Sequence, residues 1–170
     1  MNKVEAGMNV VVVNSQGVSL PSWSDSIITF ALKVLNEIQQ DNWELSILVC
    51  DDNTIQELNS QYRNKNEATD ILSFSLGETI QDGEKTVYLA GDLVISLDTL
   101  RKNADYFEIS EDEELRRLLI HGILHLNGME HSNIKQNEYE QSSMLMLQEE
   151  ILNRLKNEHI IPKLSGGGDK

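Results

Sequence analysis

One segment, residues 115–131 (LRRLLIHGILHLNGMEH), constrains this chain more than any other, because it joins an apolar helical repeat to three of the four histidines. Residues four apart lie on one face of an α-helix, so His121 and His125 are expected to point in the same direction. Gly128 is a helix-stop signal, because glycine readily adopts the left-handed conformation that ends a helix. The reversed chain can then carry His131 back toward the other two imidazoles. Apolar residues surround most of this helix, which predicts that it is buried at the centre of the fold.

Three imidazoles at this spacing indicate a metal site. A single histidine beside an apolar stripe is usually a packed core residue, but here the helix supplies the geometry for two ligands and the glycine turn explains the third. Neutral imidazoles suit a divalent metal, and zinc first. The pattern therefore predicts one zinc ion per chain, bound by His121, His125 and His131. Three protein ligands leave a fourth tetrahedral position for water or substrate, which is typical of catalytic zinc sites.

The histidine spacing equals that of the metzincin peptidases, whose motif is His-Glu-x-x-His-x-x-Gly-x-x-His. Where those enzymes carry the glutamate that takes a proton from zinc-bound water, this chain has Gly122. Glycine has no side chain and cannot act as a base. A peptidase built on this pattern would need a base from elsewhere in the chain.

The segment HGILHLNGMEH also closely resembles the pattern His-Gly-x-Leu-His-Leu-x-Gly-Tyr-Asp-His of the YbeY endoribonucleases, bacterial metal-dependent proteins of ribosomal RNA maturation. Two further stretches are similar to that family. LNSQYRNKNEATDILSFSL at 58–76 resembles its Leu-Asn-x-x-Tyr-Arg and Thr-Asp-Val-Leu-Ser-Phe segment, and AGDLVIS at 90–96 resembles its Gly-Asp-Ile-x-Ile-Ser strand. The chain departs from the pattern at Met129, usually Tyr, and at Glu130, usually Asp.

The resemblance implies a zinc-dependent, single-strand-specific endoribonuclease of ribosomal RNA maturation and ribosome quality control. It implies the same three histidine ligands, and it matches Arg63 to the family's functional arginine. The planar guanidinium of Arg63 would hold a phosphate through paired hydrogen bonds. The implied partners are a single-stranded ribosomal RNA precursor and the small ribosomal subunit or its assembly proteins, with no DNA partner.

Two other functions stay open at the level of the sequence. The first is a zinc metallopeptidase-like hydrolase, which Gly122 disfavours. The second is a non-catalytic ribosome assembly factor whose metal joins the last two helices. Removing a structural metal should melt the fold, whereas removing a catalytic metal should abolish activity with little loss of structure. Without the resemblance, Arg63 is an ordinary arginine of a surface loop.

The acidic composition argues against a nucleic-acid substrate. The formal net charge is −14 and the pI is near 4.6, whereas domains that bind nucleic acids are usually basic. A binding site is decided by local charge, however, and a metal ion with Arg63 and Lys65 can make a positive cleft on an acidic protein. We therefore expect weak affinity for free RNA, so that a ribosomal particle or a protein partner must deliver the strand.

Cysteine content and hydropathy predict a soluble, cytoplasmic protein. Cys50 is the single cysteine and lies in the apolar run LSILVC, so it is expected to be a buried strand residue and no disulfide can form within the chain. The chain has no run of about 18 apolar residues, and its amino terminus lacks a basic region followed by an apolar one. These features indicate neither a membrane span nor a signal peptide, and we expect no membrane partner.

The order of the patterns predicts an α+β fold, with a mixed sheet of about four strands, about five helices, and the histidine helix at the centre. Strands are expected at 8–15, 43–51, 70–76 and 86–97, and helices at 24–40, 53–62, 97–106, from 111 onward and at 136–157. The first two strands should be parallel because a helix separates them, and an Asp-Gly turn should join the last two as an antiparallel hairpin. The 170 residues are expected to form one metal-dependent hydrolase domain over 1–160, followed by a flexible tail over 161–170.

Smaller features give local predictions. Residues 1–7 are polar and expected to be loose. A serine at 22 or 24 is expected to cap the first helix, and Ser110 with Glu113 forms a capping box for the histidine helix. His159 is expected to be exposed and without a role.

Overall fold

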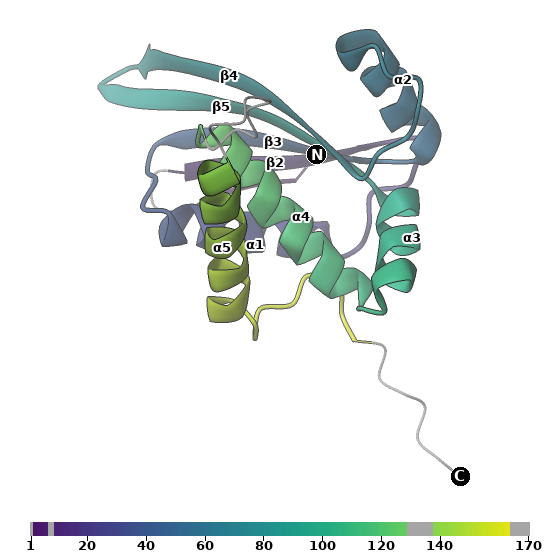
Figure 1. Ribbon diagram of the computed structural model, residues 1–170. Coiled ribbons are helices and arrows are strands. Elements are labelled where there is room, and N and C mark those ends of the chain that lie inside the picture. Colours follow the sequence, from purple (N-terminus) through teal and green to yellow (C-terminus); the bar gives the residue numbers. More distant parts are fainter. Residues whose placement is uncertain (1, 7–8, 129–137, 164–170) are drawn as a thin grey trace.

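The computed structural model describes residues 2–6, 9–128 and 138–163 (Figure 1). Within them, five strands form one mixed sheet in the order β1-β2-β3-β5-β4. The strands are β1 (Asn2–Ala6), β2 (Asn9–Gln16), β3 (Trp43–Cys50), β4 (Ile71–Asp82) and β5 (Lys85–Ser96). The five helices are α1 (Ser24–Glu37), α2 (Asp52–Arg63), α3 (Leu97–Phe107), α4 (Glu111–Leu126) and α5 (Glu138–Arg154). The predicted α+β class is confirmed, with one strand more than expected.

The strand directions follow the predicted connections. β2, β3 and β5 run parallel, and α1 links β2 to β3, as expected for two strands separated by a helix. β4 and β5 form the predicted antiparallel hairpin. Gly83 lies in its turn with φ +64, a left-handed conformation that glycine adopts without steric cost.

The prediction of a loose amino terminus is wrong for residues 2–6, which form β1 antiparallel to β2 along the outer edge of the sheet. The sequence NKVEA contains a single β-branched residue, so its composition gives little strand signal. β4 also extends beyond the expected end at residue 76, and its exposed outer half pairs with β5 away from the helices (Figure 1). Both segments are strands because a neighbouring strand supplies hydrogen-bond partners for their backbone.

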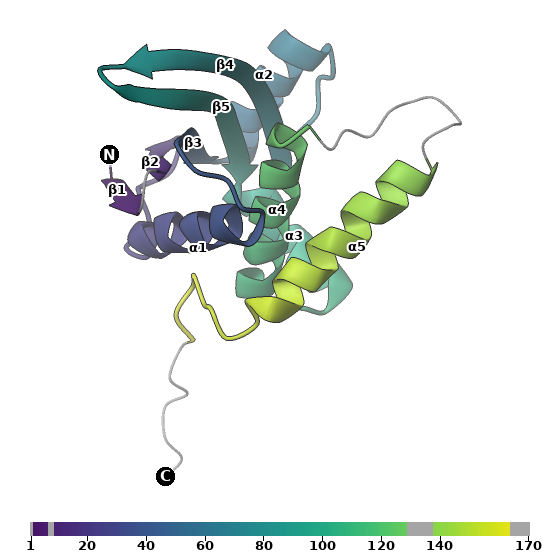
Figure 2. The ribbon, with the colours of Figure 1, turned by 90° about the vertical axis from the view of Figure 1, so that its left-hand side faces the viewer.

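Helices cover both faces of the sheet (Figures 1 and 2). The main core lies between one face and the helices α1 and α4, and α5 packs against α4 from outside. On the opposite face, α2 covers a smaller cluster formed by Cys50, Ile55, Leu72 and Val94. Successive side chains of β5 point to opposite faces of the sheet, so that Leu93 and Ile95 belong to the main core and Val94 belongs to the smaller cluster.

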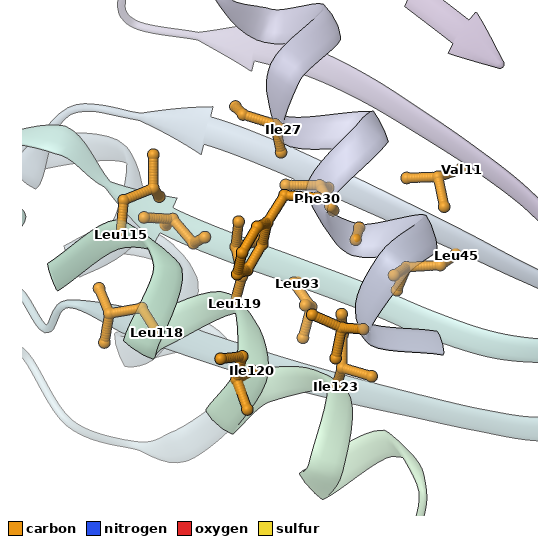
Figure 3. Close-up of a cluster of buried hydrophobic side chains, with 14 of the residues drawn as sticks. Val11, Ile27, Phe30, Leu45, Leu93, Leu115, Leu118, Leu119, Ile120 and Ile123 are labelled. Carbon is orange, nitrogen blue, oxygen red and sulfur yellow. The ribbon is translucent and has the colours of Figure 1, made fainter. Parts of the chain in front are cut away.

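Helix α4 is the central helix of the fold, as predicted, and is buried along most of its length (Figure 3). Its start is fixed by the predicted cap, since Ser110 Oγ accepts a hydrogen bond from the Glu113 amide at 3.0 Å. Its apolar side chains then meet the sheet and α1, and those labelled in Figure 3 are Leu115, Leu118, Leu119, Ile120 and Ile123. A helix held on several sides is a rigid support for the histidines in its last two turns.

Gly122 allows α4 to lie close to the sheet. A Cβ atom at this position would be 2.8 Å from Ile71 Cδ1 and 2.8 Å from Leu93 Cδ2. Carbon atoms that are not bonded normally stay about 3.5–4.0 Å apart. The missing side chain therefore allows α4 to pack directly against Ile71 and Leu93 of the β4–β5 pair.

The predicted serine cap of α1 is wrong. The helix begins at Ser24, and Trp23, which has no capping oxygen, occupies the N-cap position. The amide of Ser24 donates instead to the carbonyl of Pro21 at 3.0 Å. A backbone turn before the helix thus takes over part of the role that a serine side chain usually has.

His159 is exposed, as predicted, but it makes a contact that the sequence did not indicate. Its Nδ1 lies 3.0 Å from Oδ2 of Asp112, and Arg116 Nε donates to the same oxygen at 3.0 Å. Asp112 Oδ1 accepts from the amides of Ile160 at 2.7 Å and Ile161 at 2.9 Å. This buried carboxylate ties the chain after α5 to the start of α4, and the contacts reach the first residue of the predicted tail. Residues 164–170 of that tail lie outside the described residues.

Because of Asp112, the free energy of unfolding is expected to decrease as the pH falls into the acidic range. Burial acts to raise the pKa of its carboxyl, but the hydrogen bonds from His159, Ile161 and Ile160 outweigh burial, so the pKa lies below its usual value. A group whose pKa is lower in the folded state contributes stability above its unfolded pKa of about 3.9, and this contribution is lost as the pH falls through the folded pKa. Asp112→Asn should therefore lower the free energy of unfolding at pH 7 by about 1.5–3 kcal/mol and reduce its fall toward pH 3.

Urea denaturation at pH 7 and pH 3 measures both effects. Asp105→Asn, a change at an exposed aspartate of α3, is the matched control and should behave as the wild type at both pH values. An Asp112→Asn variant with wild-type stability and the same acid dependence would contradict this account.

Candidate metal centre

Two of the three predicted ligands lie one turn apart near the end of α4. His121 Nε2 is 3.0 Å from His125 Nε2, and the two ring centres are 4.5 Å apart with an angle of 76° between the planes. Two nitrogens that bind one tetrahedral zinc ion at about 2.0–2.1 Å lie roughly 3.3 Å from each other. The pair therefore has the donor chemistry and nearly the spacing of a two-nitrogen clamp for zinc.

The third predicted ligand, His131, lies outside the described residues. Among residues 2–6, 9–128 and 138–163, no group of three His, Cys, Asp or Glu side chains is placed to hold a metal ion. The helix stop before His131 is confirmed, since α4 ends at Leu126 and Gly128 has φ +81. The three-ligand zinc site itself stays a prediction.

A chain of hydrogen bonds leads from His121 to an ion pair. His121 Nδ1 is 2.8 Å from Oε1 of Gln148, a buried residue of α5. Gln148 Nε2 donates to Glu149 Oε1 at 3.3 Å, and Arg117 donates to both oxygens of Glu149, from Nε at 2.9 Å and from Nη2 at 3.3 Å. The hydrogen bond from Arg117 is the main reason that the pKa of Glu149 lies below its usual value, so this carboxylate is ionised near neutral pH.

A cavity of about 610 Å³ lies beside the two histidines. Its walls come from the last turns of α4, the first half of β4, the end of α2 and the loop that follows α2. Five side chains with ionisable groups line it, and they are Arg63, Lys65, Glu67, His121 and His125. The fold thus brings Arg63, singled out from a distant part of the sequence, into the same cavity as the two described histidines.

Arg63 is the last residue of α2 and reaches the edge strand β4. Its Nη2 donates to the backbone oxygen of Ser73 at 2.8 Å, and its guanidinium carbon is 5.9 Å from the centre of the Phe74 ring. The loop after α2 is held by Asn59, whose buried amide donates to the backbone oxygen of Glu67 at 2.9 Å. These contacts fix both the guanidinium and the loop wall of the cavity.

Gln148 is the residue of this site that sequence reasoning missed. It lies on the buried side of α5, four residues after Met144 and four before Leu152, both of which are also buried. A polar side chain within an apolar stripe is the signal that could have identified it, because buried polar groups need hydrogen-bond partners. The sequence does not reveal its partner, because His121 lies on another helix.

Cys50 is buried in β3, as expected, and burial is the main reason that the pKa of its thiol is raised to about 12. A thiol with this pKa stays protonated and unreactive at neutral pH. In the part of the chain that the structure describes, no helix combines the length and apolar character that crossing a membrane requires.

Comparison with known proteins decides the family. The model of the family described as "Endoribonuclease YbeY" matches residues 12–156. This chain belongs to the YbeY endoribonuclease family. The matched range contains all three YbeY-like segments at 58–76, 90–96 and 121–131, so the family resemblance is confirmed.

Several relatives named Endoribonuclease YbeY match most of the chain. The protein of Treponema denticola is 49% identical over 132 residues, which cover 77% of this chain and 83% of that one. The protein of Treponema pallidum is 41% identical over 146 residues, covering 85% and 89%, and that of Borreliella afzelii is 40% identical over 154 residues, covering 89% and 97%. A solution structure of a Thermotoga maritima protein has a similar fold, with a TM-score of 0.56 at 22% identity over 92% of this chain and 100% of the other.

Proposed function

We propose that this YbeY-family chain is a metal-dependent endoribonuclease that cleaves phosphodiester bonds in single-stranded ribosomal RNA precursors. The observation that supports the proposal is that one cavity contains both a pair of converging imidazoles and the guanidinium of Arg63, which are groups suited to binding a metal ion and a phosphate. The relatives named Endoribonuclease YbeY, 40–49% identical over most of the chain, support RNA as the substrate.

The metal would be one zinc ion per chain, held by His121, His125 and His131. The donor set fits, because imidazole nitrogen is a common zinc ligand and the Nε2 atoms of His121 and His125 converge to 3.0 Å. When bound, zinc supplies a Lewis acid that polarises a phosphate oxygen and lowers the pKa of water. The protein's contribution is to hold the two imidazoles on a buried helix, so that their positions need little adjustment.

Arg63 would hold the phosphate of the RNA strand. A guanidinium has five N–H donors in one plane, and the Ser73 carbonyl accepts from Nη2 of Arg63. The planar fork can bind two phosphate oxygens at once. Because Ser73 and the Phe74 ring already contact the guanidinium, Arg63 loses little side-chain freedom when it binds a phosphate.

The metallopeptidase-like alternative needs a base near the metal, and position 122 cannot supply one. A side chain there would begin against Ile71 and Leu93, at the contact between α4 and the sheet. Gly122 is therefore a packing residue in this chain. The second alternative is an assembly factor with a structural metal. It predicts that removal of the metal melts the fold, whereas the nuclease should lose activity and keep its fold.

The charge of the protein suggests how the RNA arrives. The whole chain has a formal net charge of −14, while Arg63 and Lys65 line the cavity beside the histidines. Long-range repulsion of RNA and local attraction then oppose each other, so free RNA should bind weakly. We propose that the small ribosomal subunit or its assembly proteins deliver the strand, in the cytoplasm, during ribosomal RNA maturation and ribosome quality control.

Comparing Arg63→Ala with Arg101→Ala tests this function. Arg63→Ala should lower kcat for cleavage of a single-stranded ribosomal RNA fragment by roughly 10²–10³-fold, because a donor to the developing phosphate charge is lost. Its zinc content should stay at the wild-type value, since arginine is not a ligand. Arg101 is an exposed arginine of α3, and Arg101→Ala should cleave as the wild type does.

Two results would contradict different parts of the proposal. If Arg63→Ala cleaved RNA at the wild-type rate, Arg63 would not have the phosphate-binding role. A wild-type protein that binds zinc and degrades casein but leaves RNA intact would contradict the nuclease itself and support the peptidase alternative.

A further inference from the structure

We infer that Gln148 is a positioning residue for the metal centre, which holds His121 in the tautomer with its proton on Nδ1, so that Nε2 presents its lone pair to the metal. The inference rests on the proposed zinc site and names a residue outside the histidine motif. At the charged end of the hydrogen-bond chain, the direction of each bond is unambiguous.

The ion pair of Arg117 and Glu149 sets that direction. Arginine has only donors, and Nε and Nη2 of Arg117 donate to the two oxygens of Glu149 at 2.9 and 3.3 Å. Glu113 accepts a further bond from Arg117 Nη2 at 3.1 Å, which helps to keep the guanidinium in this orientation. The carboxylate of Glu149 is therefore an acceptor and cannot donate.

The side-chain amide of Gln148 lies between Glu149 and His121, and its contact with Glu149 determines which end faces the histidine. Because Glu149 Oε1 can only accept, the Gln148 atom 3.3 Å from it must be the NH₂ group. The carbonyl oxygen of Gln148 then faces Nδ1 of His121 at 2.8 Å. A carbonyl oxygen only accepts, so Nδ1 carries the proton, and the lone pair of the neutral imidazole lies on Nε2. Nε2 is the atom that converges on His125 Nε2.

Burial of Gln148 stabilises its hydrogen bond with His121. Gln148 is 5% exposed, so water cannot easily replace the imidazole as the partner of its carbonyl oxygen. Leaving a buried acceptor without its donor is unfavourable, because the group has lost its hydration and gains no hydrogen bond in return. Gln148 also lies on α5, which packs against α4, so the second helix fixes the ring orientation of a ligand on the first. Partners of this kind typically change metal affinity by about 10–100-fold when they are removed.

A Gln148→Met variant separates positioning from packing, because methionine fills a similar volume but has no strong acceptor. Zinc affinity, measured by competition with a chelator, should fall by about 10–100-fold. Gln148→Glu keeps an acceptor oxygen and should restore most of the affinity. Ile151→Val loosens the packing of the same helix without touching His121, and should bind zinc as the wild type does.

Imidazole ¹⁵N NMR on the full-length protein gives a readout that packing alone would not move. The wild type should show His121 protonated at Nδ1 with Nε2 as the ligating nitrogen, and the Nδ1 proton should exchange slowly with water. In Gln148→Met this proton should exchange faster, and in Gln148→Glu it should again be protected. Should Gln148→Met fail to fold, the wild-type tautomer and the Gln148→Glu affinity still decide the matter.

Wild-type zinc affinity in a folded Gln148→Met, or a proton on Nε2 of His121 in the wild type, would overturn the inference. Zinc binding with the expected tautomer but without RNA cleavage would overturn the nuclease proposal and leave this inference standing. A wild-type chain that binds no zinc would overturn the zinc site and this inference together.

Discussion

Gly122→Glu is expected to lower the free energy of unfolding by roughly 4 kcal/mol or more, out of the 5–15 kcal/mol typical of a folded domain. The new Cβ would lie 2.8 Å from terminal carbon atoms of both Ile71 and Leu93, so these buried side chains or α4 itself would have to shift. The carboxylate would begin in an apolar contact without a hydrogen-bond partner, which adds the cost of burying a polar group. Urea denaturation followed by circular dichroism measures the loss.

Gly122→Ala is the matched control, because it adds the clash without the charge. It should lower the free energy of unfolding less than Gly122→Glu does. Overpacking costs roughly 1–3 kcal/mol, and the higher helix propensity of alanine offsets about 1 kcal/mol of this cost. Although Gly122→Glu restores the metzincin motif in sequence, we expect no cleavage of casein. A stable, well-folded Gly122→Glu variant would show that position 122 does not face the sheet as described.

His121→Ala and His125→Ala are each expected to reduce zinc from about one ion per chain to far below one, because a site with two remaining ligands holds zinc poorly. Cleavage of RNA should fall to the level of the chelator-treated wild type. Elemental analysis of the purified variants measures the first effect, and a single-stranded RNA cleavage assay measures the second.

His159→Ala is the control for these variants, since His159 contacts Asp112 near the start of α4 and not the cavity. It should keep the zinc content of the wild type. Full zinc occupancy in both His121→Ala and His125→Ala would defeat the assignment of the metal ligands.

The parts of the fold with a strong local pattern could be predicted from the sequence. The apolar repeat of α4, its Ser110 cap and the stop at Gly128 identified the central helix and placed His121 and His125 on one side of it. The spacing of strands and helices also gave the parallel β2–β3 pair and the β4–β5 hairpin. In each case the residues that determine the structure lie within a few positions of each other in the sequence.

The features that the sequence did not reveal depend on partners far away in the chain. β1 is a strand because β2 lies beside it, and α1 starts without a serine cap because a preceding backbone turn satisfies its first amide. His159 has a partner only because the chain after α5 returns to Asp112. Gln148 reaches His121 only because α5 packs on α4. Local propensity cannot report such contacts, since it contains no information about which elements meet.

The most direct test of the central claim is the cleavage of single-stranded ribosomal RNA by the purified wild-type protein, before and after chelation and again after zinc is returned. Metal content and circular dichroism are recorded at each step. We predict about one zinc ion per chain, cleavage that disappears on chelation while the fold is largely retained, and recovery with zinc. Cleavage that is unaffected by complete metal removal would contradict a metal-dependent nuclease, and loss of the fold on chelation, with no cleavage in the zinc-loaded protein, would indicate a structural metal instead.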